Sequence, residues 1–192
     1  MDLDLNGKIA VVTGSSKGIG YAAAYLLVRE GATVVIAARR ESALAEASAE
    51  IERETGRTVD TFAMDVAETG DLDRFTGWLK EKQGRADILI NNAGTGTYKP
   101  FLEVTDDELQ YGMAINFFAQ FRLSQRLVPL MMAVGSGSIV NVAGRTAYQT
   151  ANPSGSTCTG PARAAELRFT ADELRPHNIR VNCVVPGVVV TE

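Results

Sequence analysis

A glycine-rich stretch at residues 13–20, Thr-Gly-Ser-Ser-Lys-Gly-Ile-Gly, constrains the fold of this chain more than any other feature. An apolar, strand-like run at residues 9–12 enters it, and an apolar pattern with helical spacing leaves it. Such glycines let the backbone turn tightly and approach a pyrophosphate, which then faces the N–H groups at the start of the helix. A ligand-free turn is the alternative, but the position between a strand and a helix favours dinucleotide binding. The predicted phosphate-binding residues are Gly14, Ser15, Ser16, Lys17, Gly18, Ile19 and Gly20.

Segments rich in β-branched residues alternate with helical patterns along the whole chain. This alternation predicts an α/β fold, a doubly wound parallel sheet with helices on both faces in a three-layer sandwich. A length of 192 residues predicts one domain, residues 1–192. The predicted strands cover residues 8–12, 33–38, 58–64, 86–90, 138–142 and 179–185.

The apolar spacing also predicts which helix faces are buried. The first helix is expected to bury Ile19, Ala23, Leu26 and Leu27 and to end at a left-handed cap on Gly31. A long helix after Pro100 begins with a capping-box pattern at 105–108 and carries Met113, Phe117, Phe121 and Leu127. Asn116 lies in its middle, where a short amide is a mediocre helix former; it has either a functional role or a hydrogen bond between helices.

The composition limits the classes of function that this chain can have. The net charge of −4 gives no basic surface for nucleic acid, and no apolar run is long enough to cross a membrane. The acidic start has no signal-peptide pattern, so we expect a cytoplasmic protein. Two cysteines and one histidine, without the spacing of metal ligands, predict no metal site.

Polar or glycine-containing turns follow the predicted strands at their carboxyl ends, where open α/β sheets bind ligands. They include the glycine-rich stretch, Arg39, Asp65, the turn 91–94, Gly144 and the pair Pro186-Gly187. This convergence predicts one ligand site at that edge of the sheet.

These motifs resemble those of the short-chain dehydrogenase/reductase family. The resemblance covers nearly the whole chain and implies a Rossmann-type domain that binds NAD(P)(H) and a small-molecule substrate. It implies that Asp65, followed by Val66, bonds the adenine amino group and that Asn92, Ala93 and Gly94 line the adenosine ribose. By the same resemblance, Pro186, Gly187 and Thr191 hold the nicotinamide amide.

Charge predicts which of the two nicotinamide cofactors is bound. An acidic residue at the end of the second strand would bond a ribose 2′-hydroxyl, but Ala38 stands there, followed by Arg39 and Arg40. Together with Lys17, these cations suit the 2′-phosphate of NADP(H). The alternative is a solvated basic rim without a ligand.

The residues expected to catalyse depart from the family pattern. The resemblance implies a serine after the fifth strand, a tyrosine acid/base and a lysine four residues later, with an asparagine completing a proton relay. Only Asn116 stands in place, and Gly144 takes the serine position. One alignment puts Thr159 and Arg163 at the tyrosine and lysine positions, and another puts Thr157 and Pro161 there. No lysine follows Lys99, so no alignment restores the pair.

Candidates for the missing groups come from the segment after the fifth strand. Thr159 is a far weaker acid than a phenol, while Arg163 on the same helix face could bond the cofactor ribose. Tyr148 could serve as proton donor, or it could be an ordinary exposed loop residue; Ser154 and Ser156 have similar standing.

Three functions follow from this combination. The first is an NADP(H)-dependent oxidoreductase acting on a carbonyl or secondary alcohol with an altered or impaired catalytic site. The second is a catalytically inactive NADP(H)-binding regulatory or scaffold homologue, and the third, ranked last, is a lyase, isomerase or dehydratase. The resemblance also implies a homo-oligomer formed through the long helix and the next one. Family members usually continue beyond the end of this sequence, which therefore is either a short protein or a fragment.

Overall fold

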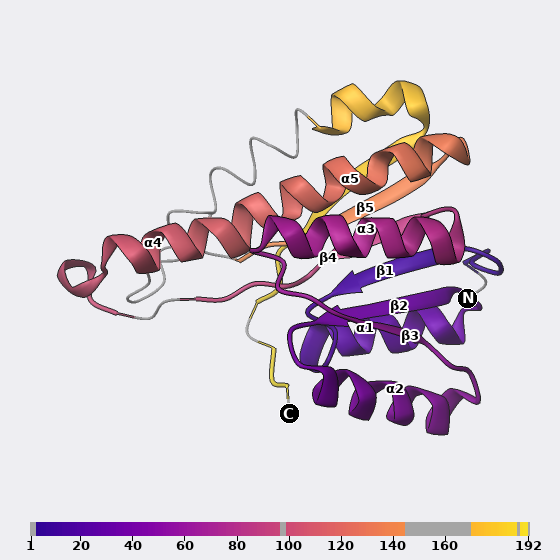
Figure 1. The fold of residues 1–192 in the computed structure, drawn as a ribbon, viewed down its shortest axis with the longest axis horizontal. Helices are drawn as coiled ribbons and strands as arrows, with labels where there is room; N and C mark the ends of the chain where they lie inside the picture. Colours follow the sequence, from indigo (N-terminus) through magenta and orange to yellow (C-terminus); the bar gives the residue numbers. More distant parts are fainter. Residues whose placement is uncertain (1–2, 97–98, 145–169, 188, 192) are drawn as a thin grey trace.

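The computed structural model describes residues 3–96, 99–144, 170–187 and 189–191. At its centre is a six-stranded sheet with the order β3-β2-β1-β4-β5-β6, in which every neighbouring pair is parallel (Figure 1). The strands are β1 Ile9–Thr13, β2 Thr33–Ala38, β3 Asp60–Ala63, β4 Ile88–Asn91, β5 Gly137–Val142 and β6 Ile179–Val184. The predicted doubly wound α/β fold is confirmed, with strand ends that differ from the prediction by one or two residues.

The strand order reverses at β1, which pairs with β2 on one side and β4 on the other. Val11 lies in register with Val35 of β2 and with Leu89 of β4. The connections leaving β1 and β4 therefore run to opposite faces of the sheet and open a crevice between their carboxyl ends. This crevice is where the predicted ligand site should lie.

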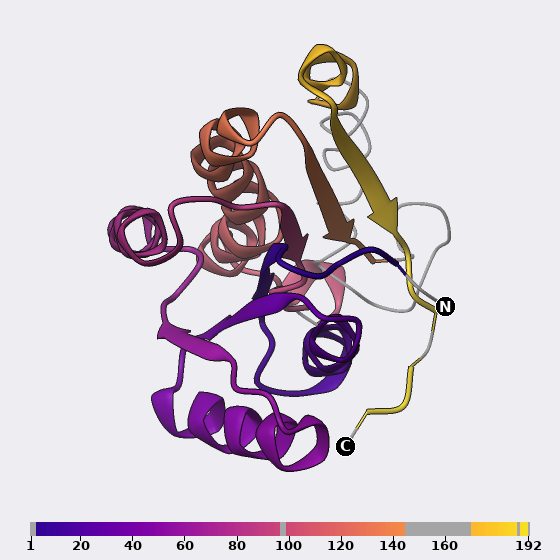
Figure 2. The same ribbon diagram turned by 90° about the vertical axis from the view of Figure 1, so that its right-hand side faces the viewer.

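Helices cover both faces of the sheet (Figure 2). One face carries α1 (Gly18–Arg29) and α2 (Glu41–Thr55), and the other carries α3 (Thr69–Gln83) and α5 (Ala119–Ala133). Ahead of α5, η1 (Phe101–Glu103) and α4 (Asp106–Met113) lead into a π-helical turn, η2 (Ala114–Phe118). A helical segment at 170–174 and η5 (Arg175–His177) precede β6.

Each face of the sheet has its own apolar core, because side chains of a strand alternate between the faces. Beneath α1 and α2, the sheet contributes Ala10, Val12, Val34 and Ile36. Beneath α3 and α5, it contributes Val11, Val35, Leu89 and Ile139. Trp78 packs on this second core. In the described parts of the chain, no helix has the length and apolar character needed to cross a membrane.

Helix faces were predicted less well than strands. The buried face of α1 consists of Gly20, Ala24 and Val28, whereas Leu26 is exposed. Small residues face the sheet here because the helix lies close to it; a Cβ added at Gly20 would stand 2.4 Å from the Gly14 carbonyl oxygen. The left-handed conformation of Gly31 is confirmed, with a φ of 99°.

The long helix predicted after Pro100 is interrupted. Its capping box at Thr105 and Glu108 is confirmed, but the helix widens into the π turn η2 before it continues as α5. The core-facing side consists of Ile115, Ala119, Leu123, Leu127, Leu130 and Met131. Phe121, predicted on the same face as Met113, is exposed instead.

Candidate functional site

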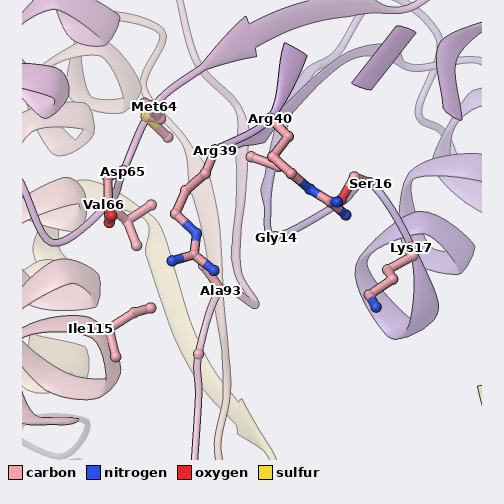
Figure 3. A pocket seen from close by; sticks show the side chains of 12 residues that line it. Gly14, Ser16, Lys17, Arg39, Arg40, Met64, Asp65, Val66, Ala93 and Ile115 are labelled. Atoms are coloured by element: carbon pink, nitrogen blue, oxygen red, sulfur yellow. The ribbon is translucent and has the colours of Figure 1, made fainter. Parts of the chain in front are cut away.

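A cavity of about 460 Å³ lies at the carboxyl edge of the sheet, in the crevice beside β1 (Figure 3). Loops that follow β1, β2, β3 and β4 contribute to it, together with the π turn. It is lined by Gly14, Ser16, Lys17, Ala38, Arg39, Arg40, Met64, Asp65, Val66, Ala93, Gly94 and Ile115. Nine of the predicted cofactor residues therefore meet in one cavity: Gly14, Ser16, Lys17, Arg39, Arg40, Asp65, Val66, Ala93 and Gly94.

The glycine-rich loop has no room for side chains at two of its glycines. A Cβ added at Gly14, whose φ is 64°, would stand 2.8 Å from the Cα of Ala93. A Cβ at Gly20 would stand 2.5 Å from the side-chain nitrogen of Asn92. Gly18 has a φ of 63°, a conformation that suits glycine. The loop thus keeps its backbone bare where it borders the cavity.

Hydrogen bonds fasten this loop to the neighbouring strands. The Ser15 hydroxyl donates to the carbonyl of Val12 at 2.7 Å and accepts from the N–H of Ala37 at 2.9 Å. Thr13 Oγ1 accepts from the N–H groups of Asn92 and Ala93 at 3.0 and 3.1 Å. Ser15 is fully buried and does not line the cavity, so its side chain supports the loop rather than the ligand.

Asn92 has a similar supporting position. Its side-chain nitrogen donates to the carbonyls of Thr13 and Gly14, both at 3.0 Å. These bonds tie the turn after β4 to the loop after β1 on the two sides of the crevice. The spacing between the two walls of the cavity is therefore fixed by protein bonds.

Three cations surround the cavity. Lys17 stands at the start of α1, while Arg39 and Arg40 follow β2. In Figure 3, Arg39 extends into the cavity towards the level of Ala93, and Arg40 extends to the side where Ser16 lies. None of the ion pairs in the described parts of the chain includes any of these three cations. Within residues 3–96, 99–144, 170–187 and 189–191, their charge is therefore not paired with a carboxylate.

Asp65 contributes the acidic group on the opposite wall. Its Oδ1 accepts from the N–H of Ala67 at 3.0 Å, and its own N–H donates to Asp71 at 2.8 Å. The Arg74 guanidinium and, to a smaller extent, the Asp65 N–H lower the pKa of the Asp71 carboxyl. The Asp65 carboxylate is thus held in orientation by its own turn.

Asn116 lies in the π turn and is buried, with 4% of its surface exposed. Its Oδ1 accepts from the Thr95 N–H at 3.0 Å, and its Nδ2 donates to the Thr95 carbonyl at 2.8 Å. A Cβ at Gly94 would stand 2.9 Å from that Oδ1. Both hydrogen-bonding groups of Asn116 therefore hold the loop that follows β4. π turns occur frequently at functional sites.

A buried polar cluster beneath this loop was missed in the sequence. Asn91 Nδ2 donates to Asn141 Oδ1 at 2.8 Å and to the Ser124 hydroxyl at 3.1 Å. Gln120 Nε2 lies 3.5 Å from the Asn91 carbonyl, while its Oε1 is buried without a hydrogen bond. The sequence signal for this cluster was an asparagine in each of two apolar strands, Asn91 in β4 and Asn141 in β5. The bonds of Asn91 link β4, β5 and α5 near the carboxyl ends of the two strands.

Comparison with known proteins decides the family. The family model for short chain dehydrogenase matches residues 8–192. The chain belongs to the short-chain dehydrogenase/reductase family. It is 35% identical over 196 residues to the uncharacterized oxidoreductase YvrD of Bacillus subtilis, a match that covers 100% of this chain and 72% of YvrD. It is also 35% identical over 187 residues to a sorbitol dehydrogenase of Cereibacter sphaeroides, covering 96% of this chain and 72% of that protein.

Solved structures of this family agree with the fold. L-Sorbose reductase from Gluconobacter frateurii, complexed with NADPH and L-sorbose, gives a TM-score of 0.94 at 37% identity, covering 100% of this chain and 73% of the reductase. A metagenomic short-chain oxidoreductase in complex with NADP gives 0.90 at 32% identity, covering 97% and 85%. The chain is thus a short-chain dehydrogenase/reductase oxidoreductase with NADP-type relatives.

Other residues that the short-chain dehydrogenase/reductase pattern singles out lie away from the cavity or outside the described part. Thr191 lies beside the glycine-rich loop, 3.5 Å from the Cβ position of Gly18. With Ile19, it lines a second cavity, of about 670 Å³, between α1 and residues 189–191. Pro186 and Gly187 line neither cavity. Tyr148, Thr159 and Arg163 are outside the described residues, so their catalytic roles stay predictions.

Proposed function

We propose that this chain binds NADP(H) and acts as an oxidoreductase on a carbonyl or secondary alcohol, with an altered catalytic site. The observation that carries the proposal is the placement of Lys17, Arg39 and Arg40 around one cavity, where none of them forms an ion pair with a carboxylate of the described residues. A 2′-phosphate would complete this arrangement, because charge-assisted hydrogen bonds to phosphate are strong.

The residues present fit a dinucleotide. The cradle formed by Gly14 and Ala93 has no space for a side chain at Gly14, so the loop backbone remains open to a pyrophosphate. Gly14, Ser16 and Lys17 would hold the phosphates, and Asp65 and Val66 would bind the adenine. When bound, the nicotinamide supplies or accepts a hydride, while the protein provides orientation and a proton.

The proton donor is the altered part of the site. Asn116 is in the position that the family uses, but Gly144 replaces the serine, and in the alignment that we favour Thr159 and Arg163 replace the tyrosine and lysine. Threonine gives up a proton far less readily than tyrosine, and arginine stays protonated. We propose that Tyr148 or water delivers the proton, and that Arg163 binds the ribose.

The same departures from the family's catalytic residues favour a second function. Because no lysine follows Lys99, the chain could bind NADP(H) without turnover, as a regulatory or scaffold homologue. Two assays separate the functions: fluorescence titration with NADPH for binding, and NADPH consumption with a panel of ketones for chemistry. Consumption with any ketone supports the enzyme, whereas tight binding without consumption across the panel rejects it in favour of the binding module. Absence of binding rejects both.

Homo-oligomerisation is a further part of the proposal. Phe118, Phe121 and Met132 are each about two-fifths exposed on the helix formed by η2 and α5. Exposed large apolar side chains on one helix suit a contact with a second copy. Sedimentation analysis should give a dimer or tetramer, and a monomer at all concentrations would contradict this expectation.

A further inference from the structure

One side-chain hydrogen bond links the cofactor cavity to α4. Arg39 Nη1, at the end of β2, donates a hydrogen bond of 3.2 Å to the phenol oxygen of Tyr111 on α4, 72 residues away in the sequence. Tyr111 stands four residues before Ile115, which lines the same cavity. Tyr111 lies in the last turn of α4, just ahead of the π turn that carries Ile115, and it reaches the cavity through its bond to Arg39.

The Tyr111 phenol is a suitable hydrogen-bond partner for an arginine whose charge must remain available to a ligand. A phenol accepts a hydrogen bond without neutralising the guanidinium charge, whereas a carboxylate would neutralise it. Arg74, Arg85 and Arg126 show the contrast, since each pairs with an aspartate. Tyr111 engages one of the five N–H donors of Arg39, which leaves the guanidinium charge for a ligand.

The bond to Tyr111 also reduces the conformational entropy that Arg39 must lose when a ligand binds. A free arginine side chain has many rotamers and loses conformational entropy when it grips a ligand. The bond to Tyr111 restricts the side chain beforehand, in a conformation that extends into the cavity (Figure 3). Preorganisation of this kind raises affinity by lowering the cost of ordering.

We infer that Tyr111 is a positioning residue for NADP(H): it holds Arg39 where the guanidinium meets the 2′-phosphate, and so contributes to the choice of NADP(H) over NAD(H). The inference rests on the proposed function. It assigns a specificity role to a residue on α4 that acts through Arg39.

The effect should be small and selective. Tyr111 is about two-fifths exposed, and water competes for such a hydrogen bond. Loss of one hydrogen bond of this kind weakens binding by about three-fold. The loss should fall on ligands that carry the 2′-phosphate and spare those that do not.

The test compares dissociation constants for NADPH, NADH and adenosine 2′,5′-bisphosphate in the wild type, Tyr111→Phe, Arg39→Ala and the double variant. Tyr111→Phe keeps the ring and removes only the hydroxyl. It should weaken NADPH and the bisphosphate about three-fold and leave NADH unchanged. In the Arg39→Ala background, the same change should have no effect, because its partner is gone. The matched control is Tyr25→Phe on α1, which should alter none of the three affinities.

Failure of the inference and failure of the proposed function give different results. If wild-type protein binds NADPH and NADH equally, the NADP(H) proposal falls and the role of Tyr111 falls with it. If the wild type prefers NADPH and Tyr111→Phe preserves or increases that preference, only the inference is overturned. An equal weakening of NADPH and NADH also overturns it, because a merely structural role would act on both cofactors.

Discussion

The two halves of the sheet's carboxyl edge differ in what their side chains do. Around β1, β2 and β3, the loops leave bare glycine backbone facing a cavity, together with cations that form no ion pair among the described residues. Around β4 and β5, the polar side chains bond mainly to one another or to loop backbone, as Asn91 does with Asn141 and Asn116 does with Thr95. In the first half the polar groups face the cavity, and in the second half they form structural bonds. The proposed nucleotide binding and the proposed proton transfer are therefore expected to be separable by mutation.

The largest expected effect comes from introducing the family's acid/base residues into the second half of the edge, around β4 and β5. In the alignment that puts Thr159 and Arg163 at the tyrosine and lysine positions, the variant Gly144→Ser, Thr159→Tyr, Arg163→Lys introduces the groups that the family uses for acid/base chemistry. General acid/base catalysis contributes roughly 100-fold or more, so kcat for ketone reduction should rise by about that factor. NADPH affinity should change little, because the first half of the edge is untouched and a lysine at position 163 can still donate to the cofactor ribose. The single variant Arg163→Lys is the control, and a triple variant no faster than the wild type would refute the separation of the two halves.

The second prediction concerns a substitution that should disrupt the proposed nucleotide site around β1, β2 and β3. Gly14→Asp adds a Cβ that would stand 2.8 Å from the Ala93 Cα, together with a carboxylate next to the predicted pyrophosphate. NADPH affinity, measured by fluorescence titration, should fall by about 100-fold or more, which corresponds to roughly 3 kcal/mol. Gly70→Asp on α3, where a Cβ meets nothing within 4 Å, is the matched control and should bind normally. Unchanged affinity in Gly14→Asp would remove the phosphate-cradle assignment.

The third prediction tests whether Asn116 is structural. Asn116→Ala removes both bonds to Thr95 from a buried site, so the free energy of unfolding should fall by about 2 kcal/mol. Thermal and urea unfolding measure this change, with the exposed Gln125→Ala on α5 as the control. A variant as stable as the wild type would show that these two bonds contribute little to holding the loop after β4.

The smallest expected effect concerns pH. The Lys99 ammonium, 2.5 Å away, and the Thr105 N–H lower the pKa of the Glu108 carboxyl below its ordinary value of 4.5. A lowered folded-state pKa gives stability that is present above pH 4.5 and is lost as the pH falls through the folded-state value. The melting temperature of Glu108→Gln should therefore depend less on pH below 4.5 than that of the wild type. Parallel pH curves for the two proteins would contradict this assignment.

The nucleotide half could be predicted from sequence because its signals are local. Gly14 and Arg39 each stand directly after a strand whose apolar run is easy to identify, Lys17 follows in the same loop as Gly14, and parallel strands bring their carboxyl ends together. The inward direction of the Ser15 side chain could not be predicted, since it depends on the neighbouring N–H of Ala37 in β2.

The structure around β4 and β5 could be predicted less well, because it depends on contacts that sequence patterns do not encode. The π turn at Asn116 shifts the helix face, so Leu123 is buried and Phe121 is exposed, whereas Leu127 is buried as predicted. On α1, apolar spacing favoured large side chains, whereas the close approach to the sheet selects Gly20 and Ala24. The Arg39–Tyr111 contact joins two segments with no shared periodicity.

The most direct test of the account is the ratio of the dissociation constants for NADPH and NADH in the wild-type protein. The unpaired charges of Lys17, Arg39 and Arg40 predict that NADPH binds at least about ten-fold more tightly. The preference should shrink as salt is added, because exposed charges are screened. Equal affinities for the two cofactors at low salt would contradict the account.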